Sequence, residues 1–98
     1  MTISGKRIID TFVLKHARSR SSFTKWIAEI ENLHPANHSE LKQLFPMVDY
    51  VGNKRYVFNI GGNNYRLVAI VAFVEGMLFV RWCGTHAEYS KKEDCSKL

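Results

Sequence analysis

The spacing of apolar residues changes once along this chain, at Pro46, and that change limits the folds open to it. Before Pro46 the apolar residues recur three and four positions apart, which is the spacing of an amphipathic helix. After Pro46 they alternate or run together in short segments separated by glycine and asparagine, as in β-hairpins. Helices followed by hairpin-connected strands are typical of α+β proteins. The pattern therefore predicts N-terminal helices packed on one face of an antiparallel β-sheet.

Three helices are expected before Pro46. They cover residues 7–17, 21–33 and 37–45. Ser21 or Ser22 is expected to cap the second helix, and Asn37 or Ser39 the third, because short polar side chains accept hydrogen bonds from the first free N–H groups. Proline stops the third helix, since it cannot donate a main-chain hydrogen bond.

Four strands are expected after Pro46. They cover residues 47–51, 54–60, 65–74 and 77–83. The "GGNN" stretch between the second and third strands tolerates the positive φ angles of a tight turn. The third strand is almost continuously apolar, so it is predicted to be central and covered on both faces. The polar residues 84–98 are expected to form one short helical turn and then a frayed end.

Length and charge narrow the class of protein. The 98 residues are enough for one domain, residues 1–98. The formal net charge of +5 favours an anionic partner, most often nucleic acid although an acidic protein would also fit, or it serves solubility alone. No segment has the length of a signal peptide core or a membrane span. With only two cysteines, the chain is expected to be cytoplasmic and not membrane-bound.

Arg66 is the residue that fits its surroundings least, because it stands at the entrance of the most apolar segment. A guanidinium at a strand end has a fixed backbone and binds phosphate oxygens through two parallel hydrogen bonds. Arg81, on the next strand, could approach it. The alternatives are an ion pair with Glu75 or Glu88, or an edge charge that discourages aggregation.

The stretch "GTHAEYSKK", residues 84–92, follows the last expected strand and carries a second group of candidates. His86 can give or take a proton near neutral pH, and Tyr89 can stack on a base or donate a proton. Lys91 and Lys92 can bind RNA backbone. The alternative is that the histidine is merely solvated and the tyrosine merely covers the core.

Lys54 and Arg55 form a basic pair at a turn beside Tyr56. Such a pair suits contact with an RNA backbone, although turns are commonly basic for solubility alone.

A zinc site is a further alternative. Cys83, His86, His34 and His38 are four potential ligands with loosely finger-like spacing, but Pro35 interrupts the second pair. The chain contains no phosphate-binding loop of the Walker type, no dinucleotide fingerprint and no HExxH motif. No metal or other cofactor is therefore expected.

Nearly the whole chain resembles the HigB toxin family, a branch of the RelE-like toxins of bacterial type II toxin–antitoxin systems. The segments that carry the resemblance are "FPMVDYVGNKRYVFNIGGNNYRLVAIVAF" and "VRWCGTHAEYSKK", and "FNIGGNNYRL" together with "GTHAEY" is the specific part. The resemblance implies two or three helices packed on one antiparallel sheet. This chain departs from the family pattern at Ser90, because relatives often carry an acidic residue directly after the tyrosine.

The resemblance also implies an activity, the metal-independent cleavage of messenger RNA, in RelE-like members typically during translation on the ribosome. The RNA 2′-hydroxyl attacks the adjacent phosphate, so the protein must supply rigid cations and proton-transfer groups. Carried over by position, Arg66 would hold the phosphate, His86 would transfer a proton, and Tyr89 would stack on a base or assist that transfer. The RNA backbone would be bound by Lys54, Arg55, Arg81, Lys91 and Lys92.

Two readings of function follow. In the first, the chain is an endoribonuclease toxin whose partners are messenger RNA, the ribosome and a cognate antitoxin, a DNA-binding HigA-like protein. In the second, it is a basic module that binds RNA or ribosomes without cutting RNA. New 5′ ends on messenger RNA distinguish the enzyme from the binder.

Overall fold

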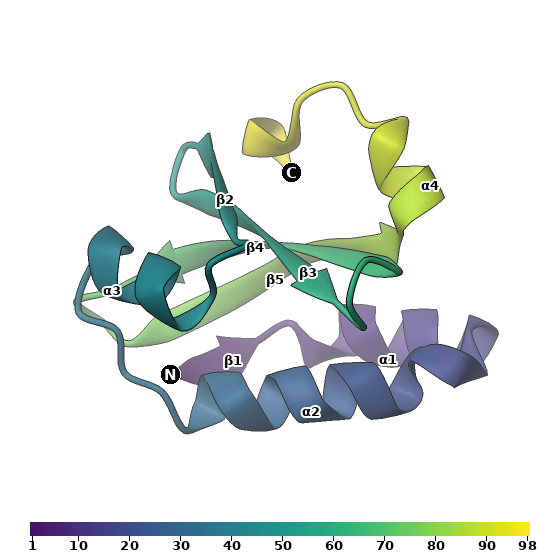
Figure 1. Ribbon diagram of the computed structural model, residues 1–98, viewed down its shortest axis with the longest axis horizontal. Coiled ribbons are helices and arrows are strands. Elements are labelled where there is room, and N and C mark those ends of the chain that lie inside the picture. Colours follow the sequence, from purple (N-terminus) through teal and green to yellow (C-terminus); the bar gives the residue numbers. More distant parts are fainter.

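A computed structural model describes all residues, 1–98, and confirms the α+β class. The helices are α1 (Lys6–Lys15), α2 (Arg20–Glu31), α3 (His38–Leu44) and α4 (His86–Ser90), with 3-10 turns η1 (Ala17–Ser19) and η2 (Cys95–Lys97). The strands are β1 (Thr2–Ser4), β2 (Asp49–Gly52), β3 (Arg55–Ile60), β4 (Tyr65–Ala72) and β5 (Met77–Thr85). Figure 1 shows α1 and α2 together on one side of the sheet and the C-terminal segment on the other.

The sheet has the order β1-β5-β4-β3-β2. The four strands predicted after Pro46 pair as antiparallel neighbours, and β4 is central as expected. One strand was not predicted: Thr2–Ser4 pairs in parallel with the start of β5, with Ile3 opposite Leu78. The sheet is therefore antiparallel apart from this short edge strand.

The predicted helix ends are partly correct. Asn37 caps α3, because its side chain accepts a hydrogen bond from the Glu40 N–H. The prediction of Ser21 or Ser22 as the cap of α2 is wrong. Helix α2 already begins at Arg20 after the 3-10 turn η1, so both serines lie within its first turn. Ser19, which precedes the helix, donates its hydroxyl to the His16 main-chain oxygen instead.

The two faces of the sheet bury different residues, because successive side chains of a strand point to opposite sides. On the face toward α1 and α2, apolar side chains of the strands and helices form one core cluster, which includes Phe23, Phe58, Leu67 and Leu78. Val57 and Val68 are 2% and 0% exposed yet stand outside that cluster. They lie on the other face, which we call the second face, and Arg66 lies on it with them.

The C-terminal segment folds back over this second face, so the prediction of a frayed end is wrong. Thr85 and Glu88 form reciprocal hydrogen bonds that start α4. Further on, main-chain oxygens of the tail accept hydrogen bonds from side chains of the sheet, including Asn53 to Ser96 at 3.1 Å. Figure 1 shows this segment above the strands, with the C-terminal residue close to β2. No helix in the protein combines the length and apolar composition that a membrane crossing requires.

Candidate functional site

Arg66 is the only charged side chain buried in the protein, at 7% exposure. It lies on the second face of β4 with Asn59 of β3 and Gly84 of β5 as its cross-strand neighbours. The turn between β3 and β4 holds its guanidinium. Nη1 donates to the main-chain oxygens of Asn63 (3.3 Å) and Tyr65 (3.0 Å), and Nη2 donates to the Asn63 side-chain oxygen.

The charge of Arg66 has no carboxylate partner. The two ion pairs of the protein, Lys6–Glu31 and Lys97–Asp94, both lie elsewhere. The alternative that Arg66 pairs with Glu75 or Glu88 is therefore wrong. Its Nε–H makes no hydrogen bond within the protein, while the other side of the guanidinium is fixed by three. A buried cation with neutral partners and a free donor is suited to binding an anion.

Tyr89 of α4 lies over Arg66, with the guanidinium carbon 5.9 Å from the ring centroid. This contact joins two residues that the sequence placed on separate motifs. Burial raises the pKa of the Tyr89 phenol, and the nearby Cys95 and Asp49 raise it further, while Arg66 opposes the shift. The phenol is consequently a proton donor at neutral pH and not a base.

His86 is the first residue of α4, and its main chain is anchored to the turn that holds Arg66. Its N–H donates to the Asn64 main-chain oxygen at 2.9 Å. Its imidazole is exposed and forms no hydrogen bond within the protein. The structure therefore brings the backbone of His86 to the Arg66 site and leaves the ring free to meet a ligand.

The predicted basic residues fall into two groups. Lys54, Lys91 and Lys92 are exposed, and the Lys92 ammonium lies 5.0 Å from the Trp82 ring centroid. Arg55 and Arg81 instead donate hydrogen bonds to the main-chain oxygen of Leu98. Arg81 does not contact Arg66, so the predicted approach of these two arginines is not observed.

The four residues of the zinc alternative are not brought together. No group of three or more histidine, cysteine or acidic side chains is placed to hold a metal ion. The His38 ring is hydrogen-bonded to the Tyr56 hydroxyl at 2.9 Å. Cys83 lies in the core beside the Ile8 main-chain oxygen, and burial raises the pKa of its thiol to about 12.

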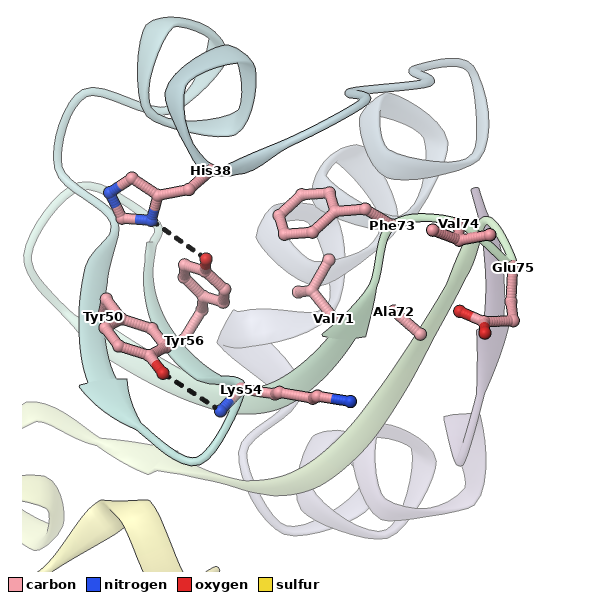
Figure 2. Close-up of a pocket in the computed structure, with 9 residues that line it drawn as sticks. All are labelled: His38, Tyr50, Lys54, Tyr56, Val71, Ala72, Phe73, Val74 and Glu75. Atoms are coloured by element: carbon pink, nitrogen blue, oxygen red, sulfur yellow. Dashed lines mark hydrogen bonds between the residues drawn. The ribbon is translucent and has the colours of Figure 1, made fainter.

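Sequence reasoning missed two features. The first is Asn63, which the pattern marked only as a turn residue although its side chain holds Arg66. The second is a cavity of about 650 Å³ on the helical side of the sheet, lined by His38, Tyr50, Tyr56 and Phe73 among others. Figure 2 shows the His38 and Tyr56 side chains meeting there, with Lys54 at the rim. The sequence signal that could have pointed to this cavity was the pair Tyr50 and Tyr56, which lie opposite each other on β2 and β3.

Comparison with known proteins adds a family to this geometry. A family model described as HigB_toxin, RelE-like toxic component of a toxin-antitoxin system, matches residues 19–92. The chain is 43% identical over 54 residues to an "mRNA interferase HigB" of Escherichia coli O6:H1. It is 46% identical over 52 residues to the "mRNA interferase toxin HigB" of Escherichia coli K12 and to an "mRNA interferase HigB" of Shigella flexneri.

These alignments cover 53% and 50% of this chain, and the chain spans about half the length of the curated relatives it matches, 52% and 49%. The family match is broader and includes Arg66, His86, Tyr89 and all five predicted RNA-binding residues. It ends at residue 92, before the tail that covers Arg55 and Arg81. With more than half of its residues matched, the chain belongs to the HigB_toxin family, the RelE-like toxic components of toxin–antitoxin systems.

Proposed function

We propose that this protein is the toxin of a type II toxin–antitoxin system and that it cleaves messenger RNA during translation on the ribosome, without a metal ion. The observation that carries the proposal is Arg66, a buried cation with no carboxylate partner and a free Nε–H. Family membership and the names of the curated relatives, which are mRNA interferases, support the same activity.

The chemistry is an internal transfer within the RNA. The 2′-oxygen attacks the adjacent phosphorus, the bond from phosphorus to the 5′-oxygen breaks, and a cyclic phosphate and a free 5′-hydroxyl result. Arg66 binds a non-bridging phosphate oxygen and stabilises the negative charge that builds up there. Because the turn fixes the guanidinium before RNA arrives, little reorganisation is needed at the transition state.

Two proton transfers accompany the attack. Tyr89 is assigned as the donor to the departing 5′-oxygen, because its raised pKa keeps the phenol protonated and because it stands over Arg66. His86 is assigned as the acceptor of the 2′-hydroxyl proton, since its exposed ring begins the helix that carries Tyr89. Lys54, Lys91 and Lys92 bind backbone phosphates on either side.

The partner proposed for this toxin is a cognate antitoxin, a DNA-binding protein of the HigA type. The family description, a component of a toxin–antitoxin system, supports a partner of this kind. Co-expression with the antitoxin should relieve growth arrest and yield a complex that co-purifies. We propose that the toxin acts in the cytoplasm, because translating ribosomes are found there.

The test is to incubate the purified chain with translating ribosomes and map RNA ends. The expected result is a set of new 5′-hydroxyl ends on messenger RNA that disappears with Arg66→Ala. A protein that binds ribosomes but leaves no new ends would instead be the non-catalytic basic module. Repeating the reaction with free messenger RNA separates dependence on the ribosome from cleavage itself.

A further inference from the structure

Arg55 of β3 and Arg81 of β5 converge on a single acceptor, although β4 lies between their strands. Arg55 donates to the Leu98 main-chain oxygen from Nε at 3.0 Å and from Nη2 at 2.9 Å. Arg81 donates to the same oxygen from Nε at 3.1 Å. Three N–H groups from two positive charges thus converge on one oxygen of Leu98, and neither arginine forms an ion pair with an aspartate or glutamate side chain.

A bulge in β5 makes this convergence possible. Val68 pairs with Trp82 and Ala69 pairs with Val80, so Arg81 is the extra residue of the strand. An extra residue breaks the alternation of side chains, so that the neighbouring residues Arg81 and Trp82 both have their side chains on the second face. Both side chains make contacts on the second face. Arg81 donates to the Leu98 oxygen, and the ring centroids of Trp82 and Tyr89 lie 6.4 Å apart.

The donors that meet at this acceptor position suit an anionic oxygen such as that of a phosphate. Two guanidinium groups that aim several N–H donors at one point match the charge and hydrogen-bonding capacity of a phosphate oxyanion. The Leu98 oxygen therefore occupies a position at which the two arginines can bind an RNA phosphate oxygen.

The position also fits an RNA strand that runs through the proposed cleavage site. Arg66 pairs with Asn59, and Arg55 lies four residues farther along β3 on the same face. At roughly 3.3 Å per residue, the two arginines are about 13 Å apart along the strand. An RNA held at Arg66 can therefore continue over the same face toward Arg55 and Arg81.

The tail that supplies the Leu98 oxygen is attached to the sheet mainly by polar contacts. Besides the arginine bonds, the Asn53 side chain donates to the Ser96 main-chain oxygen. Cys95, Ser96 and Leu98 are only half-buried. A segment with few buried apolar groups and exposed hydrogen bonds opens at a low cost in free energy. Figure 1 shows this C-terminal segment above the strands of the sheet.

We propose that residues 93–98 act as a removable cover that competes with RNA phosphate for Arg55 and Arg81. This inference rests on the proposed function, since the competitor is the RNA that the enzyme cleaves. The cover keeps the two arginines occupied in the free protein and is released when RNA binds. This segment lies beyond the residues that the family match includes, 19–92.

A reversible disulfide tests the proposal. A Cβ atom built on Gly52 would lie 3.5 Å from the Ser96 Cβ, which is within disulfide range. Gly52→Cys with Ser96→Cys, made in a Cys95→Ser background, should lock the cover on oxidation. The reduced form of the same variant is the matched control, since it carries the same strain from the positive φ of 98° at position 52.

The readout is the affinity for a short fluorescein-labelled single-stranded RNA, measured by anisotropy in both redox states. We expect oxidation to weaken binding by about ten-fold or more, because two charged contacts are denied to the RNA. Equal affinities for the two states would show that residues 93–98 do not compete with RNA, and would not contradict RNA binding itself. If neither state nor the wild type binds this RNA, the cover is wrong, whereas the proposed function is decided separately by cleavage on translating ribosomes.

A measurement on the unmodified protein keeps the test decisive if the disulfide does not form. Hydrogen exchange of residues 93–98 is followed with and without the same RNA. Release of the cover predicts faster exchange of the amides in this segment when RNA is bound. Unchanged or slower exchange would show that RNA binds without displacing the segment, and the inference would be wrong.

Discussion

The side-chain oxygen of Asn63 accepts a hydrogen bond from the guanidinium of Arg66, so a turn residue holds the one buried charge of the sheet. The main-chain oxygen of the same asparagine accepts a second bond from Arg66. Asn63 is itself exposed, and it leads directly into β4. In the proposed mechanism it is therefore a positioning residue, which acts on RNA through the arginine.

Substitution of Asn63 should reduce the rate of cleavage more than the stability of the fold. Asn63→Ala removes one of three bonds that orient Arg66, and we expect kcat to fall about ten-fold. Asn63→Asp should lower it further while raising the thermal midpoint, because the new carboxylate pairs with Arg66 and competes with phosphate. Asn32→Ala, which removes a comparable amide contact to Ala28 on α2, is the control. Equal rates in all three variants would remove Asn63 from the site.

Arg66→Ala should abolish growth arrest and leave the protein folded. Losing one preorganised charge contact typically costs about 100- to 1,000-fold in rate. The thermal midpoint should change little, because a buried cation without a carboxylate partner adds little net stability. Single-turnover cleavage and thermal unfolding, measured on the same preparations, check the two parts separately. A variant that unfolds would identify Arg66 as structural, and one that stays toxic would place the site elsewhere.

His86→Gln should lower the rate in the same direction as Arg66→Ala. If both residues act on one transition state, the double variant should lose less than the product of the two single effects. The measurement is a double-mutant cycle on the cleavage rate. Strictly multiplicative losses would mean that His86 contributes to a separate step.

RNA binding should weaken steeply with added salt if backbone phosphates supply most of the affinity. Each phosphate contact that is lost, for example by Lys54→Ala, should reduce the slope of log affinity against log salt by about one unit. Lys6→Ala is the matched control, because Lys6 is equally basic but is paired with Glu31 on the helical side. An affinity that is independent of salt would count against the basic surface.

Cleavage should persist in EDTA, since the proposed mechanism uses only protein groups and the RNA hydroxyl. Elemental analysis of the purified protein should find no stoichiometric zinc. One zinc per chain, lost together with activity on chelation, would revive a metal site and displace the roles assigned to Arg66 and His86.

Alkaline pH should destabilise the protein partly through Cys83. Burial raises the pKa of this thiol from 9.0 to about 12, so the folded state keeps a proton that the unfolded state loses. The stabilising effect is complete below about pH 9 and is lost as pH rises toward 12. The free energy of unfolding should therefore fall more steeply above about pH 9 for wild type than for Cys83→Ala. Parallel pH profiles would contradict the buried, protonated thiol.

The sequence by itself determined the features that depend on neighbours along the chain. The spacing of Phe23, Trp26 and Ile30 specifies a helix with one buried face, and all three are buried in α2. The alternation in β3 and the apolar run of β4 specify strands, and Asn37 or Ser39 marks a helix start, of which the structure uses Asn37. These are local preferences of the backbone and of hydrophobic burial, so a pattern of a few residues is enough to read them.

Only the tertiary structure decided which distant groups meet. Thr2–Ser4 carries no strand pattern of its own and becomes a strand because β5 offers a free edge. The tail is polar, yet it is ordered because Arg55 and Arg81 bind its main chain. Tyr89 reaches Arg66 only after α4 turns back over the sheet. Such contacts join residues far apart in sequence, and their energy depends on the assembled fold, which no local spacing encodes.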